Sequence, residues 1–334
     1  MSMLLATHDL CRMHDPGQDH PERPDRLTAV LKGFEGAGIN DALTWIEASE
    51  APRALIERVH PGALMDSLQR LCEAGGGQID GDTFVSKDSY HAALRAAGAG
   101  LDLVAALDRG EADVGWSVVR PPGHHALANT QMGFCLINNI AVTARALADR
   151  GERVAIIDID AHHGNGTQAI FYDDPDVLFV SVHQFPWYPY TGRVDEVGEG
   201  EGEGTTINVP LPAFATGDVL RHAFTTVIAP AIERHKTTWL LVSAGFDGHK
   251  TDPLTDLGYS AADYADIVAN MLPLVPASRR LLFLEGGYDL QALYDCTASV
   301  AGAAVGVEVP RESTTSGGPG REIVDMVRSL HFRY

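Results

Sequence analysis

The sequence is poor in the features that mark secreted, membrane and nucleic-acid-binding proteins. Its four cysteines are scattered and have no CxxC spacing, which argues against a disulfide framework or a thiolate zinc site and favours a reducing cytoplasm. No apolar run reaches the length of a signal peptide or a membrane span, because the one in MSMLLATHDLC stops too soon. Basic residues are also scarce: 25 Lys and Arg stand against 45 Asp and Glu, a formal net charge of −20. Direct nucleic-acid binding, which needs clustered cations, is therefore not expected.

What remains is the composition of a globular protein with a large core. The 334 residues are 45% hydrophobic and 21% charged. An acidic surface favours cationic substrates such as basic peptides or polyamines. The one biased segment, GEGEGEG at 198–204, is interpreted as a mobile acidic loop before a strand. No linker divides the chain, so we predict a single domain over residues 1–334.

Short apolar runs alternate with amphipathic helical stretches between residues 115 and 290. The runs are VGWSVV, VAIIDI, VLFVSV, WLLVSA and LLFLEG. Continuous apolar strands separated by helices predict an α/β fold with a parallel sheet covered on both faces. The helix-rich stretch from 24 to 108 is expected to pack around that sheet.

Polar side chains follow all five of these strands. The segments that follow are RPPGHHA, DIDAHHGNG, SVHQF, SAGFDGH and EGGYD. Open parallel sheets bind ligands outside the carboxyl ends of their strands. Five successive strands thus bring Asp, His, Ser or Tyr to one edge, which indicates a site.

A metal site is the first expectation at this edge. Asp160 and His162 lie two residues apart, so their side chains point the same way in an extended segment. Asp247, after another strand, would be the third ligand. Three protein ligands with an open fourth position describe a catalytic zinc site, in which the metal activates a water. The simpler alternative is that Asp160 only caps the next helix. If the residues do form a metal site, a site rich in carboxylates also accepts Fe²⁺.

The tandem histidines His124 and His125 are suited to proton transfer near neutral pH. Asp158 and Asn165 are available to orient them. An imidazole held by a carboxylate tends to stay protonated, whereas one held by an amide is more readily neutral. We therefore predict that His125 is the acid–base and that His124 is a charged electrostatic partner.

Tyr288 follows two glycines, which allow the backbone to bend and present the phenol to the site. A phenol that donates to a carbonyl oxygen would stabilise the oxyanion of a tetrahedral intermediate. A buried tyrosine with one hydrogen bond is the structural alternative.

The motifs RPPGHHA, GFCLINNIAV, DIDAHHGNG, SAGFD and LEGGY together resemble the zinc-dependent histone deacetylase superfamily, which includes histone deacetylase-like amidohydrolases and acetylpolyamine amidohydrolases. They occur in the family's order, and the similarity runs from His20 to Tyr288. The resemblance implies the three-layer arginase/deacetylase-like fold with a central eight-stranded parallel sheet. It also implies hydrolysis of an acetyl amide with release of acetate.

The resemblance further implies the residues that line a tunnel for the acyl-lysine side chain. Leu254 would lie at its mouth, and Arg23 would lie near an internal acetate exit. A rim aspartate would grip the substrate backbone, with Asp82 preferred over Asp80. The walls would be Gly133 and Phe134 on one side and Tyr188 or Trp187 on the other.

Two kinds of cation are implied by the same resemblance. One Zn²⁺ per chain would bind Asp160, His162 and Asp247. K⁺ would bind the side chains of Asp158 and Ser181 and the backbone carbonyls of Asp160, His162 and Val182. A second monovalent site would lie near Phe171, Asp174 and Val177.

Departures from the family pattern indicate the subclass. Asn165 and Glu285 are similar to class II enzymes, and Tyr288 is not the histidine of the weakly active class IIa enzymes. Leu254 is not the glutamate that gates the polyamine-selective class II enzyme, which weakens a polyamine assignment.

The sequence therefore predicts a cytoplasmic, zinc-dependent amidohydrolase that deacetylates N-ε-acetyl-lysine. An acetylpolyamine amidohydrolase is the alternative enzyme, and a non-catalytic acyl-lysine-binding protein is the alternative of another class. An arginase-type binuclear manganese enzyme, with Asp252 and Asp158 near a second metal, fits the HH and GGY motifs poorly. A homo-oligomer is plausible by resemblance only, and the acyl chain length stays open.

Overall fold

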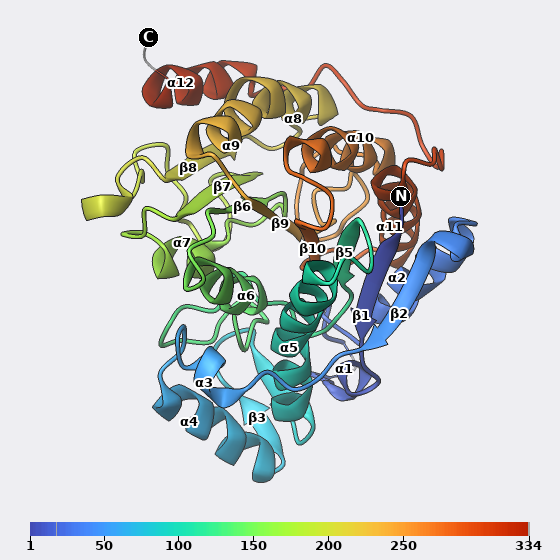
Figure 1. Ribbon diagram of the computed structural model, residues 1–334, viewed down its shortest axis with the longest axis vertical. Coiled ribbons are helices and arrows are strands. Elements are labelled where there is room, and N and C mark those ends of the chain that lie inside the picture. The colour runs from blue at the N-terminus through green and yellow to red at the C-terminus, as the bar shows by residue number, and fades with distance from the viewer. Residues whose placement is uncertain (18, 333–334) are drawn as a thin grey trace.

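The computed structural model describes residues 1–17 and 19–332, and its centre is one eight-stranded parallel sheet (Figure 1). The strand order is β2-β1-β5-β10-β9-β6-β7-β8, and every neighbouring pair is parallel. The α/β fold with an eight-stranded parallel sheet is thereby confirmed. The strands are β1 (Met3–Thr7), β2 (Leu43–Glu47), β5 (Val114–Ser117), β6 (Val154–Asp158), β7 (Val177–Gln184), β8 (Thr206–Leu211), β9 (Trp239–Ala244) and β10 (Arg280–Leu284).

Two of the strands were not expected from the sequence. β1 uses the short apolar run near the start of the chain as a buried strand between β2 and β5. β2 lies inside the stretch predicted as helix-rich, and it pairs with β1 so that Leu43 lies opposite Met3. β2 is an edge strand on which Trp45 is exposed, so it lacks the continuous apolar run of a strand buried on both faces. The prediction that residues 24–108 only pack around the sheet was therefore incomplete.

Helices flank the sheet on both sides (Figure 1). On one side, α5 packs on α6 and on β1 and β5; on the other, α2 packs on α11 and α11 on α10. The helix α12 packs on β8 and α8. The helices are α1 (Leu10–Met13), α2 (Asp25–Gly36), α3 (Arg53–Ile56), α4 (Gly62–Glu73), α5 (Ser89–Asp108), α6 (Asn139–Ala148), α7 (Asn165–Ile170), α8 (Gly217–Ala223), α9 (Ala229–His235), α10 (Ala261–Met271), α11 (Leu290–Val305) and α12 (Arg321–His331). An antiparallel hairpin of β3 (Gly76–Gln78) and β4 (Phe84–Ser86) lies beside α4.

The strand order explains why the polar motifs meet. The five strands that carry them, β5, β10, β9, β6 and β7, are consecutive in the sheet. Because all are parallel, their carboxyl ends lie along one edge, where an open α/β sheet binds its ligand. Among the helices of the described residues, none combines the length and apolar character needed to cross a bilayer.

Candidate active site

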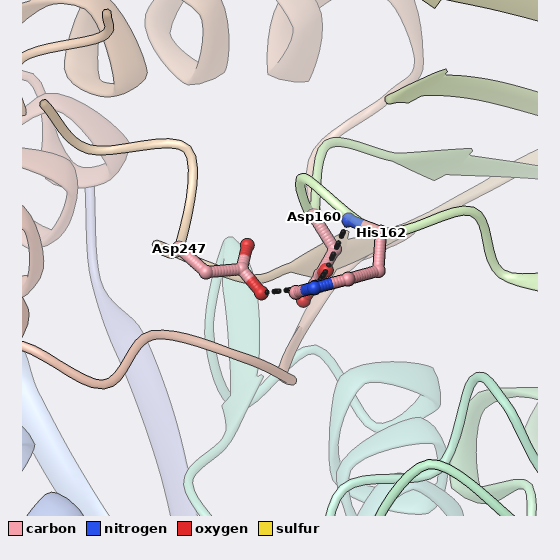
Figure 2. A group of neighbouring side chains, drawn as sticks. All are labelled: Asp160, His162 and Asp247. Atoms are coloured by element: carbon pink, nitrogen blue, oxygen red, sulfur yellow. Dashed lines mark hydrogen bonds and ion pairs between the residues drawn. The ribbon is translucent and has the colours of Figure 1, made fainter. Parts of the chain in front are cut away.

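Three buried side chains meet at the carboxyl edge of the sheet as a potential metal-binding group. Asp160, His162 and Asp247 each offer a ligand atom, and these atoms all lie within 4.8 Å of one another. The Nδ1 atom of His162 is 2.9 Å from Asp247 Oδ2 and 3.3 Å from Asp160 Oδ1, and the three side chains converge (Figure 2). Asp160 follows β6 and Asp247 follows β9, which are neighbours in the sheet. Sheet topology therefore brings together ligands that are far apart in the sequence.

The electrostatics of this group fit a divalent cation. Burial alone would lower the pKa of an imidazole, but Asp247 and Asp160 raise the pKa of His162 to about 10. Two facing buried carboxylates are costly unless positive charge lies between them. One oxygen of each carboxylate accepts a hydrogen bond from the backbone: Ala161 N donates to Asp247 Oδ1 (2.7 Å) and Gly286 N donates to Asp160 Oδ2 (2.8 Å). Two carboxylates and one imidazole form a donor set of the kind that binds divalent metal ions such as Zn²⁺.

The tandem histidines have different partners. The Nδ1 atom of His124 lies 3.0 Å from Asp158 Oδ2, whereas Nδ1 of His125 lies 2.8 Å from the amide oxygen of Asn165. Although burial lowers it, the pKa of His124 is held well above its ordinary value by Asp160 and Asp158. Burial and the positive charge of His124 hold the pKa of His125 well below its ordinary value. The arrangement gives a cationic imidazole beside a neutral one.

The backbone around the tandem histidines is held from two sides. Gly123 N and His124 N both donate to Oε2 of Glu285, at 2.8 and 3.2 Å. On the other side, Gly133 adopts φ +57°, and a Cβ there would collide with the ring of His125. A glycine is thus required for the Gly133–Phe134 segment to pass directly over His125.

Tyr288 is placed by the loop after β10. Its backbone N–H donates to Asp252 Oδ2 (2.7 Å), and the guanidinium of Arg26 lies 4.9 Å from its ring centroid. A Cβ on Gly286 would collide with the carboxylates of Asp247 and Asp160, so only glycine lets this loop approach the metal-binding group. Burial raises the pKa of Tyr288 well above its ordinary value, which keeps the phenol protonated as a donor.

A pocket of about 240 Å³ leads from the surface to this chemistry. Tyr188 forms its deep wall, with ring centroids 5.3 Å from His125 and 6.2 Å from His162. Trp187 lines the pocket too, and its indole N–H donates to the carbonyl of Leu254 (2.9 Å). The pocket is lined by Asp82, His125, Gly133, Phe134, His162, Trp187, Tyr188, Tyr190, Leu254 and Tyr288. Larger cavities, of about 570, 590, 480 and 310 Å³, lie elsewhere in the described residues and contain none of these side chains.

The two candidate rim aspartates are separated by the structure. Asp82 lines the pocket, whereas Asp80 turns toward its own loop and accepts from the backbone N–H groups of Asp82 (3.1 Å) and Thr83 (2.8 Å). Of the two, Asp82 is therefore the one placed to meet a substrate.

The structure corrects the expected position of Arg23. Its side chain is 42% exposed and lies 3.4 Å from Asp25, so it is not near an internal exit. The buried arginine is Arg26, whose Nε donates to Gly287 O (2.6 Å) and whose Nη1 donates to Glu22 (2.9 Å). The sequence HPERPDR offers two arginines three residues apart, and only the orientation of α2 shows which one points inward.

The residues proposed for the first monovalent site are also gathered together. Asp158 and Ser181 are partners in the register of β6 and β7, and both are fully buried, as are Asp160 and Val182. Burial raises the pKa of Asp158 to about 7. Near the second predicted site, Asp174 already pairs with Arg145 at 2.8 Å. A cation there would compete with that guanidinium.

Comparisons with known proteins agree with this geometry. Residues 20–304 match the family described as histone deacetylase domain. The chain is 38% identical over 309 residues to histone deacetylase 10, chloroplastic, of Oryza sativa subsp. japonica, covering 86% of this chain and 70% of that protein. It is 35% identical over 295 residues to a histone deacetylase-like amidohydrolase of Pseudomonas aeruginosa, covering 86% and 77%. The crystal structure of the HDA15 HD domain superimposes with a TM-score of 0.93 at 32% identity, over 100% of this chain and 95% of that one.

Proposed function

The chain belongs to the histone deacetylase family and is a hydrolase that acts on amides, and from that premise we propose that it removes the acetyl group of N-ε-acetyl-lysine with one Zn²⁺ per chain. One observation carries the proposal. His162 of the metal-binding group, His125 and Tyr288 all line one pocket of about 240 Å³. An apolar-walled pocket of this size fits a long aliphatic stem that ends in an amide.

Asp160, His162 and Asp247 would hold the ion. When bound, a divalent cation polarises an amide carbonyl and lowers the pKa of a water. The N–H at Nδ1 of His125 donates to Asn165, so Nε2 carries the lone pair. His125 takes the proton of the attacking water at Nε2 and returns a proton to the leaving amine.

The negative charge that develops on the carbonyl oxygen is stabilised from two directions. The phenol of Tyr288 donates a hydrogen bond to it, and the imidazolium of His124, paired with Asp158 at 3.0 Å, adds positive charge. Phe134 and Tyr188 exclude water from the stem of the substrate.

The alternatives differ from this proposal in what they need at the pocket. An acetylpolyamine carries further ammonium groups, and of the described lining residues Asp82 alone has a carboxylate to meet them. A non-catalytic acyl-lysine binder would have no use for two differently held imidazoles and a protonated phenol that lines the pocket. Acetyl-lysine deacetylation accounts for all of these groups.

We further propose that residues 1–334 form a single deacetylase domain, because the sheet takes strands from Met3 to Leu284 and α12 packs on β8. K⁺ between Asp158 and Ser181 and a homo-oligomer stay predictions. A cytoplasmic location stays a prediction as well, and two similar plant proteins are named chloroplastic.

A substrate panel tests the proposed function. The protein is stripped with a chelator and reloaded with Zn²⁺ or Fe²⁺. Turnover is then measured on acetyl-lysine peptides, acetylputrescine, acetylspermidine and longer acyl-lysine peptides. The highest kcat/KM is expected on an acetyl-lysine peptide, with no turnover before reloading. A preference for acetylpolyamines would select the alternative enzyme, and peptide binding without any turnover would select the non-catalytic binder.

A further inference from the structure

One buried carboxylate joins the loop after β9 to the loop after β10. The Oδ2 atom of Asp252 accepts from the backbone N–H groups of Tyr288 (2.7 Å) and Asp289 (3.3 Å), and Oδ1 accepts from the N–H of Leu254 (2.9 Å). Asp252 is 7% exposed. A single side chain thus fixes the backbone that carries the phenol and the backbone that carries a residue of the pocket mouth.

The path continues outward from Leu254 to the surface. The carbonyl of Leu254 accepts from the indole N–H of Trp187 (2.9 Å), and Trp187 is 36% exposed beside the pocket. Trp187, Leu254, Asp252 and Tyr288 are therefore linked in series by hydrogen bonds. The series begins where the body of a substrate would rest and ends at the group that meets its carbonyl.

Both oxygens of Asp252 accept hydrogen bonds from backbone N–H groups, so this side chain holds the two loops together. An asparagine could not replace the carboxylate, because its NH₂ would face a backbone N–H on one of the two sides.

We propose that Asp252 is a positioning residue for Tyr288 and that Trp187 acts on the same phenol through Leu254 and Asp252. Contact between substrate and the pocket mouth is thereby coupled to the placement of the oxyanion donor. This inference rests on the proposed function. Its physical basis is that a misplacement of about 1 Å at a reacting group costs up to about 100-fold in rate.

Two variants test the path in the zinc-loaded protein on an acetyl-lysine peptide. Asp252→Asn is expected to lower kcat about 10-fold with KM changed less than about twofold, since the donor is displaced and the pocket is kept. Trp187→Phe keeps an aromatic ring beside the pocket but removes the indole N–H, and it is expected to lower kcat about threefold. Asp256→Asn, an exposed carboxylate of the same loop, and Trp45→Phe, an exposed indole on β2, are the matched controls and keep wild-type kcat.

A double-mutant cycle with Tyr288→Phe separates positioning from general damage. If Asp252 and Trp187 act through the phenol, neither substitution lowers kcat further once the phenol is gone. Equal losses in both backgrounds would overturn the coupling. Should Asp252→Asn fail to fold, Trp187→Phe decides alone, because its indole lies at the surface. No wild-type turnover would overturn the proposed function and this inference with it, whereas additive losses in an active enzyme overturn only the inference.

Discussion

At the carboxyl end of the central sheet, buried charges are gathered and paired, whereas two imidazoles at the amino end have few partners. The carboxyl end holds Asp158, Asp160, Asp247 and Glu285, all essentially inaccessible, around His124 and His162. The amino end holds His235, just before β9, and His331 in α12, beside a cavity of about 590 Å³. The Nε2 atoms of these two histidines have no hydrogen-bond partner among the described residues, and burial lowers the pKa of each to about 4.

This difference in buried charge indicates that the carboxyl end of the sheet is the end that binds a ligand. Clustered buried carboxylates repel one another, and such a cluster persists when its function requires a cation. Neutral buried imidazoles need no ligand, and their cost is a missing hydrogen bond each. Removing charge at the carboxyl end should therefore abolish activity without loss of the fold, whereas removing an imidazole at the amino end should affect stability alone.

The largest expected effect comes from breaking the metal-binding group with Asp247→Asn. The variant should lose bound metal and at least about 1,000-fold of kcat/KM, because the bound ion supplies several kcal/mol of transition-state stabilisation. In the presence of a chelator it should unfold at a temperature no lower than the wild type, since one of two facing carboxylates is gone. Metal content by mass spectrometry, turnover and thermal unfolding check the three parts. A variant that retains one Zn²⁺ per chain would refute the assignment of Asp247.

The carboxyl end was largely predictable from the sequence, because strand ends and polar motifs are local signals. The apolar runs before Asp158 and Glu285 identify their strands, and a parallel sheet places the carboxyl ends of these strands at the same edge. β1 and β2 escaped prediction, because β1 lies outside the regular alternation of apolar runs and helical stretches between residues 115 and 290, and β2 is an exposed edge strand without a continuous apolar run.

Side-chain direction within a segment was the part that the sequence could not supply. Trp187 and Tyr188 are adjacent, and only the loop conformation shows that Tyr188 forms the deep wall and that Trp187 reaches Leu254. Arg23 and Arg26 pose the same problem at the start of α2. Asp252 was considered only as a metal ligand, because its bonds to the backbone of the Tyr288 loop depend on a contact 36 residues away.

The next effect compares Tyr288, which lines the pocket, with the fully buried Tyr259. Tyr288→Phe should lower kcat about 100-fold, the typical loss on removing one oxyanion donor. Tyr259→Phe is the matched control, because the hydroxyl of Tyr259 is buried without a hydrogen-bond partner among the described residues, away from the pocket. Steady-state kinetics on an acetyl-lysine peptide distinguish the two. Wild-type turnover by Tyr288→Phe would remove the phenol from the mechanism.

A smaller effect concerns the different partners of the tandem histidines. Asn165→Asp places a carboxylate against Nδ1 of His125, which stabilises the imidazolium and raises the pKa of His125 by about one unit or more. Because the base must be neutral to accept a proton, the acid limb of the kcat/KM profile should move to higher pH in the variant. Above that limb, the variant and the wild type should reach similar kcat/KM values. Asn270→Asp on the exposed face of α10 is the control. An unmoved acid limb would contradict the role of His125 as the base.

The smallest effect lies at the amino end and should appear in stability alone. His235 has an ordinary pKa of 6.5 that burial lowers to about 4 in the folded protein. Between these values the unfolded chain binds more protons, so the contribution of His235 to stability is complete above pH 6.5 and is lost as the pH falls toward 4. His235→Gln cannot titrate, so the wild type should lose up to about 3 kcal/mol relative to the variant across that window. Denaturant midpoints at pH 7, 5.5 and 4 measure this difference in stability. Groups at the carboxyl end titrate equally in both proteins, because the two sites lie apart, so their contribution to the difference cancels. Parallel stability curves for the two proteins would show that His235 does not titrate in this window. Turnover at pH 7 should be the same for both, because His235 lies outside the pocket that contains His125 and Tyr288.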